Sequence, residues 1–253
     1  MGDQLIRLLG IETATASQSV ALLEDQQVVA DACWSGPGTG GGTLLPMIDS
    51  LLQKAGFSPN SVDAVAVSVG PGSFTGVRVG LATAKGFALG TSAKVFGVST
   101  LEALAASYGL THGTVCAVLH AGRGEVYAAF YSCENSELQA LGPEAVLSPE
   151  ALALETSLPS YGDIHFIGDA VAAYRDRLQV AFRGRARVTD QGVSARPTAA
   201  TVAGLALRQI QRNETGTLPG KEVDPVYLRR AEAELNWEKG LLKSPLERLL
   251  KAL

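Results

Sequence analysis

Glycine, serine and threonine are concentrated in one short stretch that could bind an anion, Gly70–Arg78 (GPGSFTGVR). The run before it is apolar and β-branched, which predicts a buried strand, and the run after it has helical periodicity. Ser73 or Thr75 can cap this helix, and its first N–H groups then attract phosphate or carboxylate. A close strand-to-helix turn without a ligand is the alternative, because the spacing does not match the dinucleotide motif G-x-G-x-x-G.

Other residue types that commonly carry catalysis are scattered along the chain. The three histidines, His112, His120 and His165, lack the one-turn spacing of a helical metal site. No G-x-S-x-G motif surrounds a serine nucleophile. We therefore expect no metal site and no catalytic residue in this chain.

The composition is that of a soluble globular protein. Of the 253 residues, 46% are hydrophobic and 18% are charged. The net charge of −4 argues against a basic protein that binds nucleic acid unaided. The sequence shows no signal peptide and no apolar run of roughly 20 residues that could span a bilayer. Together with three unpatterned cysteines, this predicts a cytoplasmic protein without membrane contact.

The order of predicted strands and helices repeats once along the chain. Three strands, a helix, a strand and a helix follow one another between Leu5 and Leu89, a further strand and helix reach Tyr108, and the same order starts again at Thr114. This predicts a duplicated three-layer α/β unit with mixed sheets. The first hairpins of the two units, 12–17 and 120–124, would face each other across a ligand-binding cleft. The predicted helices cover 43–55, 75–89, 100–108, a segment from Ser148, 171–178 and 198–212.

Six short motifs occur in the order in which one protein family has them. The motifs are Ile11–Thr15, Leu44–Ile48, Gly70–Arg78, Gly97–Leu101, Gly124–Tyr127 and Pro225–Arg229. With these motifs the chain resembles the TsaB (YeaZ) family, a bacterial subunit for making threonylcarbamoyladenosine in tRNA. The resemblance runs from about Leu8 to Arg229 and is densest over the first 105 residues.

The resemblance implies an actin-like, Hsp70-like ATPase fold of the ribonuclease H-like type, with duplicated βββαβα subdomains. With the repeat, it divides the chain into a partner-binding subdomain (1–105), a second subdomain (106–225) and a tail with a short amphipathic helix (226–253). It implies a non-catalytic subunit that activates the related TsaD, which transfers threonylcarbamoyl to adenosine of ANN-decoding tRNAs. The ATPase TsaE is a further partner, tRNA is reached through the complex, and no cofactor is required.

Binding of ATP or ADP depends on the two hairpins. Actin-like ATPases hold magnesium through aspartates there, whereas this chain has Glu12 at the first hairpin and His120-Ala121-Gly122 at the second. Nucleotide binding stays an open alternative, and hydrolysis is not expected. The alternative functions are an actin-like ATPase or small-molecule kinase and, after these, a protease-like regulator. The candidate nucleotide or anion contacts are Thr13, Thr15, Gly72, Ser73 and Gly122.

The helices at 43–55 and 75–89 are more apolar than one sheet face requires. We expect them to dock on a similar pair of TsaD helices, and the resemblance implies a homodimer through the same face when TsaD is absent. Ordinary core is the alternative for some of these residues. The predicted interface residues are Leu45, Ile48, Leu52, Val79, Ala82 and Phe87.

Three further segments have open interpretations. Five arginines between Arg175 and Arg187 indicate either a solvated face or a contact for tRNA phosphate or an acidic partner. The segment 36–42 is glycine-rich and predicts a linker. Ser244-Pro245-Leu246-Glu247 predicts a short capped helix that docks on its own chain or on a partner.

Overall fold

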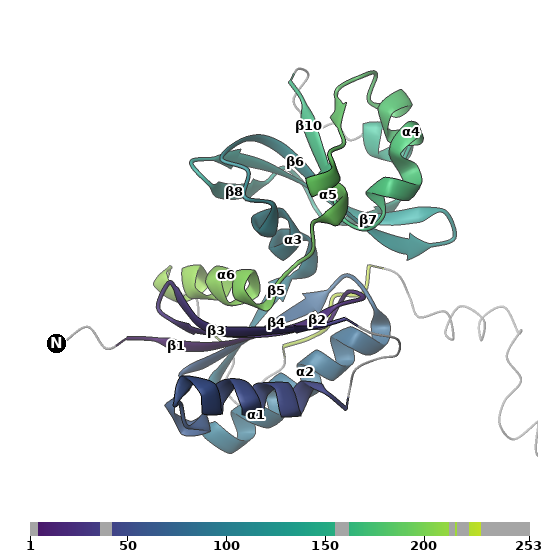
Figure 1. Cartoon of the computed structure of the whole chain (residues 1–253). Helices are drawn as coiled ribbons and strands as arrows, with labels where there is room; N and C mark the ends of the chain where they lie inside the picture. The colour runs from purple at the N-terminus through teal and green to yellow at the C-terminus, as the bar shows by residue number, and fades with distance from the viewer. Residues whose placement is uncertain (1–4, 36–41, 155–161, 213–215, 217–222, 229–253) are drawn as a thin grey trace, which may run out of the picture.

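The protein is described by a computed structural model, which covers residues 5–35, 42–154, 162–212, 216 and 223–228. The chain forms two α/β units, each built on one sheet, with helices between the two sheets (Figure 1). The predicted linker at 36–42, except for its last residue Gly42, and the predicted helix from Ser244 lie outside the described residues. No helix in the described part of the chain is long and apolar enough to cross a membrane.

The first sheet has five strands in the order β3-β2-β1-β4-β5. Strands β1, β2 and β3 pair antiparallel in sequence order, and β4 and β5 run parallel to β1. The interior strand β4 is buried along its whole length, as its continuous apolar sequence predicts. The strands are β1 (Arg7–Glu12), β2 (Gln18–Glu24), β3 (Gln27–Trp34), β4 (Ala64–Gly70) and β5 (Lys94–Ser99).

The second sheet repeats this topology. Its order is β11-β10-β6-β7-β8, with β6, β7 and β8 antiparallel and β10 and β11 parallel to β6. With the short strand β9 left out, both sheets therefore place their own strands in the order 3-2-1-4-5, and the predicted duplication is confirmed. A short strand, β9, also pairs with β7. The strands are β6 (His112–Gly122), β7 (Glu125–Glu134), β8 (Glu137–Ala140), β9 (Ala145–Leu147), β10 (Ile164–Ile167) and β11 (Ala186–Arg187).

The last helices of the two units lie between the sheets (Figure 1). Helix α3 (Thr100–Tyr108) follows the first sheet, yet its leucines pack against the second. Helix α6 (Ala199–Gln211) follows the second sheet, yet it packs against β1, β2 and β4. The range 106–225 thus contains a helix that belongs to the first core, and the domain boundaries stay a prediction.

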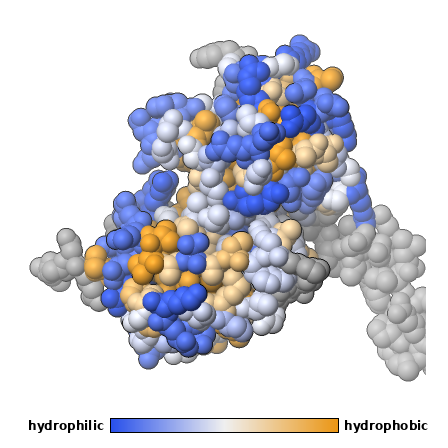
Figure 2. All heavy atoms as spheres, viewed as in Figure 1, coloured by the Kyte–Doolittle hydropathy of each residue, from blue (hydrophilic) through white to orange (hydrophobic). Residues whose placement is uncertain are grey.

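The outer helices cover the remaining sheet faces. Helices α1 (Leu44–Ala55) and α2 (Phe74–Thr91) bury their apolar sides against the first sheet, and α4 (Val171–Ala181) packs on the second. The short helices are α5 (Asp190–Ser194) and the 3₁₀ turns η1 (Pro59–Ser61) and η2 (Ala151–Leu154). On the face drawn in Figure 2, apolar residues gather over the edge strand β3, where Val28 and Val29 are exposed.

The predicted helix from Ser148 is wrong in the described residues, where the chain forms only the single turn η2. The Ser148 hydroxyl does cap this turn, since it accepts a hydrogen bond from the Ala151 amide at 3.3 Å. Leu152 is buried in the second core, whereas Leu154 is exposed. One buried side chain cannot define the apolar stripe that stabilises a longer helix.

Candidate functional site

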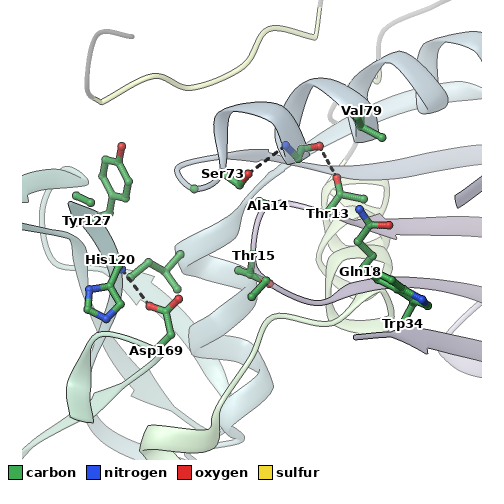
Figure 3. A pocket seen from close by; sticks show the side chains of 15 residues that line it. Thr13, Ala14, Thr15, Gln18, Trp34, Ser73, Val79, His120, Tyr127 and Asp169 are labelled. Carbon is green, nitrogen blue, oxygen red and sulfur yellow. Dashed lines mark hydrogen bonds between the residues drawn. The ribbon is translucent and has the colours of Figure 1, made fainter. Parts of the chain in front are cut away.

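A cleft of about 430 Å³ lies between the two units, and both first hairpins line it. Thr13, Thr15, Gln18 and Trp34 come from the first hairpin and the strand beside it. Figure 3 shows them across from His120, Tyr127 and Asp169 of the second unit, with Ser73 at the start of α2 between the two groups. The predicted juxtaposition of the two hairpins is therefore confirmed.

Four of the five predicted nucleotide or anion contacts line this cleft, namely Thr13, Thr15, Gly72 and Ser73. The fifth, Gly122, does not. It ends β6 beside a two-residue turn, and the lining residues from this strand are Leu119, His120 and Ala121. The positive φ angles of Arg123 (56°) and Gly124 (81°) identify a type I′ turn, which joins Gly122 to its paired residue Glu125 at the end of the hairpin.

The first hairpin packs directly on the glycine turn before α2. The Ser73 amide donates to the Ala14 carbonyl at 2.7 Å, and the Thr13 hydroxyl donates to the Gly76 carbonyl at 2.8 Å. The Ser73 hydroxyl accepts from the Gly76 amide at 3.2 Å, so Ser73 and not Thr75 caps the helix. Hydrogen bonds within the chain therefore already occupy the amide and the hydroxyl of Ser73, a predicted anion contact.

The glycines of the turn allow this backbone contact. A Cβ atom on Gly72 would overlap the Ala14 carbonyl oxygen, and one on Gly76 would overlap the Thr13 carbonyl oxygen. Glycine has no Cβ, so the two segments can approach this closely. The glycine pattern is accounted for by packing of the hairpin on the helix.

Glu12 does not face the cleft. Its carboxyl is completely buried, accepts a hydrogen bond from the Ala14 amide at 2.7 Å, and is hydrogen-bonded to the Ser68 hydroxyl. Burial raises the pKa of Glu12 from its ordinary value of 4.5 to about 7, and hydrogen bonds from Ser68, Ala14 and Thr15 oppose this rise. The buried carboxyl thus stabilises the first hairpin from inside the core, and it is not exposed to a ligand in the cleft.

Across the cleft, the backbone amide of His120 donates to Asp169 Oδ1 at 3.0 Å. The His120 ring lies 5.8 Å from the ring of Tyr174, between ring centroids. The other two histidines lie apart from this site: His165 is paired with Tyr108 at 3.2 Å, and His112 begins β6. Among the described residues, no group of three His, Cys, Asp or Glu side chains is arranged to hold a metal ion.

Sequence reasoning missed four polar or aromatic residues of the cleft: Gln18, Trp34, Tyr127 and Asp169. Asp169 carried a usable signal, because it follows β10 at the carboxyl end of a parallel strand, where ligand sites form in α/β sheets. The other three lie in antiparallel strands, where no motif distinguishes a cleft side chain from any other exposed or buried one.

Two motifs far apart in the sequence meet at the start of α2. The Val226 amide donates to the Val69 carbonyl at 2.8 Å, and Arg78 Nε donates to the Tyr227 hydroxyl at 2.9 Å. The Arg78 guanidinium also lies 3.7 Å from the ring centroid of Phe74, and the rings of Phe74 and Tyr227 are 5.3 Å apart. The segment 223–228 is thereby attached to the first unit.

Known proteins are similar in sequence to this chain over nearly all of its length. Residues 42–237 match the family model for TsaD, tRNA N6-adenosine threonylcarbamoyltransferase. The TsaB protein of Escherichia coli (strain K12), a tRNA threonylcarbamoyladenosine biosynthesis protein, is 34% identical over 92% of this chain and 98% of its own. The Haemophilus influenzae TsaB is 32% identical over 93% of this chain and 98% of its own. The chain belongs to the TsaB (YeaZ) family.

A solved structure supports the same TsaB-family assignment. YeaZ from Pseudomonas aeruginosa is 31% identical, covers 88% of this chain and 100% of its own, and has a TM-score of 0.75. A second structure, of an uncharacterized Pseudomonas aeruginosa protein with similarity to peptidase YEAZ, is 32% identical with a TM-score of 0.77, covering 89% of this chain and 100% of its own. The two duplicated sheets fit the actin-like fold predicted for TsaB.

The predicted interface residues of this TsaB-family chain divide into surface and core. Ile48 and Leu52 are only 3% and 4% exposed, because they face β2 from the inner side of α1, and ordinary core is therefore the interpretation that their burial supports. Leu45 is 62% exposed, and Ala82 is also at the surface. Val79 and Phe87 are half-buried against the first core, and Val79 also lines the cleft. An interface through these helices stays a prediction.

The arginine-rich segment is mostly paired within the chain. Arg177 makes two hydrogen bonds to the Glu150 carboxylate, one of them at 2.6 Å, and Arg187 Nε donates to Asp163 at 2.8 Å. Arg175 lies 4.0 Å from a carboxylate oxygen of Asp190. These exposed pairs favour the solvated face over a phosphate contact as the interpretation of the segment.

Proposed function

We propose that this TsaB-family chain is a non-catalytic subunit for making threonylcarbamoyladenosine in tRNA. It binds and activates TsaD, which transfers threonylcarbamoyl to adenosine of ANN-decoding tRNAs, and the ATPase TsaE is the further partner. tRNA is reached through the complex, and no cofactor is assigned to this chain. The burial of Glu12 is the observation that carries the proposal.

Glu12 occupies the position at which the actin-like fold would present a metal-binding carboxylate. Here both carboxylate oxygens are engaged by the chain, one by the Ala14 amide and one by the Ser68 hydroxyl. The carboxylate of the second unit, Asp169, is likewise bonded to the His120 amide. Both carboxylates are hydrogen-bonded to groups of the chain itself. This supports a binding role for the chain over hydrolysis of a nucleotide.

The outer surface of α1 and α2 supports partner binding. Leu45 on α1 and Leu89 on α2 are 62% and 69% exposed, and Ala82 lies two turns before Leu89 on the same side of α2. Gly86, between them, has open space where a Cβ atom would be. Exposed leucines beside small residues offer a partner helix apolar area and close approach. We infer that TsaD covers this surface and that a second copy covers it when TsaD is absent.

Reconstitution tests the proposed activity. Threonylcarbamoyl transfer to tRNA is measured with TsaD, TsaE, the enzyme that makes the threonylcarbamoyl adenylate, and this chain. We expect omission of this chain to abolish most of the transfer. An unchanged rate without it would overturn the proposal.

The partner surface is tested separately with Ala82→Glu. Because Ala82 is exposed, the variant should melt like the wild type, while a glutamate buried against a partner helix should weaken TsaD binding by about 100-fold or more. Val180→Glu is the matched control, since Val180 is an apolar residue 79% exposed on α4 of the other unit. Isothermal titration calorimetry measures the affinity of both variants for TsaD. Equal TsaD affinity for the two variants would exclude this surface.

A further inference from the structure

One side of α2 is exposed along the whole helix. Phe74 and Leu89, which are 40% and 69% exposed, lie at its two ends, and Ala82 and Gly86 lie between them. Successive exposed residues are three or four positions apart, so they share one side of the helix. We call this side the α2 stripe, and its residues are Phe74, Arg78, Ala82, Gly86 and Leu89. It is the part that α2 contributes to the proposed TsaD surface.

The last described segment, 223–228, reaches the start of the α2 stripe. The Tyr227 ring lies 5.3 Å from the ring of Phe74, between centroids, and the Tyr227 hydroxyl accepts a hydrogen bond from Arg78 Nε at 2.9 Å. Tyr227 is itself 43% exposed, so it extends the apolar surface at this end of the stripe. Residues 229–253, which we call the tail, continue the chain from this point. The stripe is thus an exposed apolar surface at the position where the tail begins.

The tail has a predicted apolar side of its own. A capped helix is predicted from Ser244, and a helix of so few residues is unstable in water unless it packs against another surface. The match to the family model ends at residue 237, so this predicted helix lies outside the residues that the family model describes. Its leucines have the spacing of one helix side, at Leu246, Leu249, Leu250 and Leu253.

The tail is long enough to place this helix anywhere on the stripe. Residues 229–243 connect Leu228 to the predicted helix, and a chain of this length spans up to roughly 50 Å. Helix α2 has 18 residues and is therefore only about 27 Å long. The stripe begins at the contact with Tyr227, so no part of it is beyond reach.

We propose that residues 244–253 dock as a short helix on the α2 stripe of their own chain and compete there with partner proteins. The leucine side of the tail covers Ala82, Gly86 and Leu89, where small residues allow two helices to approach closely. The competition rests on the proposed function, which assigns this surface to TsaD and, in its absence, to a second copy. The docking itself does not depend on that assignment.

The expected strength of the competition follows from the linkage. A short flexible connection gives the tail an effective concentration of about 1 mM at the stripe. A tail helix that binds as a separate peptide with a Kd of about 0.1 mM is then docked about ten times more often than undocked. Only the undocked fraction can bind TsaD, so the tail should weaken the apparent TsaD affinity about tenfold.

Amide spectra from NMR of the full chain, without TsaD, test the docking. Leu249→Glu should shift the amide resonances of Ala82 and Gly86, because a glutamate cannot pack on the apolar stripe. Ala252→Glu is the matched control, since it adds the same charge away from the leucine side and should leave both resonances unchanged. A synthetic peptide of residues 238–253, added to the Leu249→Glu chain, should return the resonances toward their wild-type positions with a Kd of about 0.1 mM.

Identical Ala82 and Gly86 resonances in the wild type and Leu249→Glu would overturn the proposal. Resonances that change with protein concentration and not with the residue at position 249 would also overturn it, because they would assign the stripe to a second copy of the chain.

Calorimetric titration with TsaD tests the competition separately. We expect Leu249→Glu to bind TsaD about tenfold more tightly than the wild type, and Ala252→Glu to bind like the wild type. Shifted resonances with an unchanged TsaD affinity would confirm the docking and refute the α2 stripe as the TsaD surface. Unshifted resonances would refute the docking and leave the reconstitution assay unaffected, so the failure of this proposal is distinguishable from the failure of the proposed function.

Discussion

Replacing Glu12 by glutamine should remove a pH dependence from the stability of this chain. The pKa of Glu12 rises from 4.5 to about 7 on folding, mainly because the carboxyl is buried. Each pKa unit is worth about 1.4 kcal/mol, so ionising Glu12 in the folded chain costs about 3 kcal/mol. Its favourable contribution is complete below pH 4.5 and is lost as the pH rises through 7. Between pH 5 and pH 8 the loss is about 2.5 kcal/mol.

Glutamine fits this position without ionising. Its carboxamide oxygen can accept from the Ala14 amide, and its NH₂ group can donate to the Ser68 hydroxyl, which replaces the two contacts of the carboxyl. The free energy of unfolding of Glu12→Gln should therefore fall by about 2.5 kcal/mol less than that of the wild type between pH 5 and pH 8.

Urea denaturation at the two pH values measures the free energy of unfolding, with equal slopes for both proteins as a check on two-state behaviour. Glu137→Gln, on the exposed face of β8, controls for the loss of one negative charge. If wild type and Glu12→Gln change in parallel between pH 5 and pH 8, Glu12 ionises normally in the folded chain and the reasoning is refuted.

Two further pairs of substitutions test the packing around α2. Gly76→Ala should destabilise the chain by about 2 kcal/mol or more in urea denaturation, because its Cβ would overlap the Thr13 carbonyl. Gly86→Ala in the same helix should stabilise it by about 0.5–1 kcal/mol, because its Cβ enters open space, and similar effects of the two changes would contradict this assignment. Tyr227→Ala should accelerate hydrogen exchange of the Val226 amide by about tenfold or more, since the ring contacts with Phe74 and Arg78 hold this segment. Tyr227→Phe, which keeps the ring, should have a smaller effect, and equal exchange rates in both variants would show that the ring does not anchor the segment.

Features that depend on short stretches of chain could be predicted from the sequence. The order of strands and helices identified the duplication, because hydrophobic periodicity reports each element locally. From the duplication alone it followed that hairpins 12–17 and 120–124 face each other, and both line the cleft. Ser73 was one of two predicted caps, and the cap preference of serine is also local. The motifs near Gly70 and Tyr227 supported the TsaB family before their contact was visible.

Tertiary structure decided everything that depends on which side of an element meets a distant part of the chain. Leu45 and Ile48 lie on one apolar helix, and only the position of the sheet made one of them surface and the other core. Glu12 lies at the hairpin where actin-like ATPases have a metal-binding aspartate, and only the folded chain shows that Ser68, 56 residues away, is hydrogen-bonded to its buried carboxyl. Gln18 and Trp34 became cleft residues only through the approach of the second unit. Burial and hydrogen bonding depend on such long-range neighbours, which periodicity and short motifs do not encode.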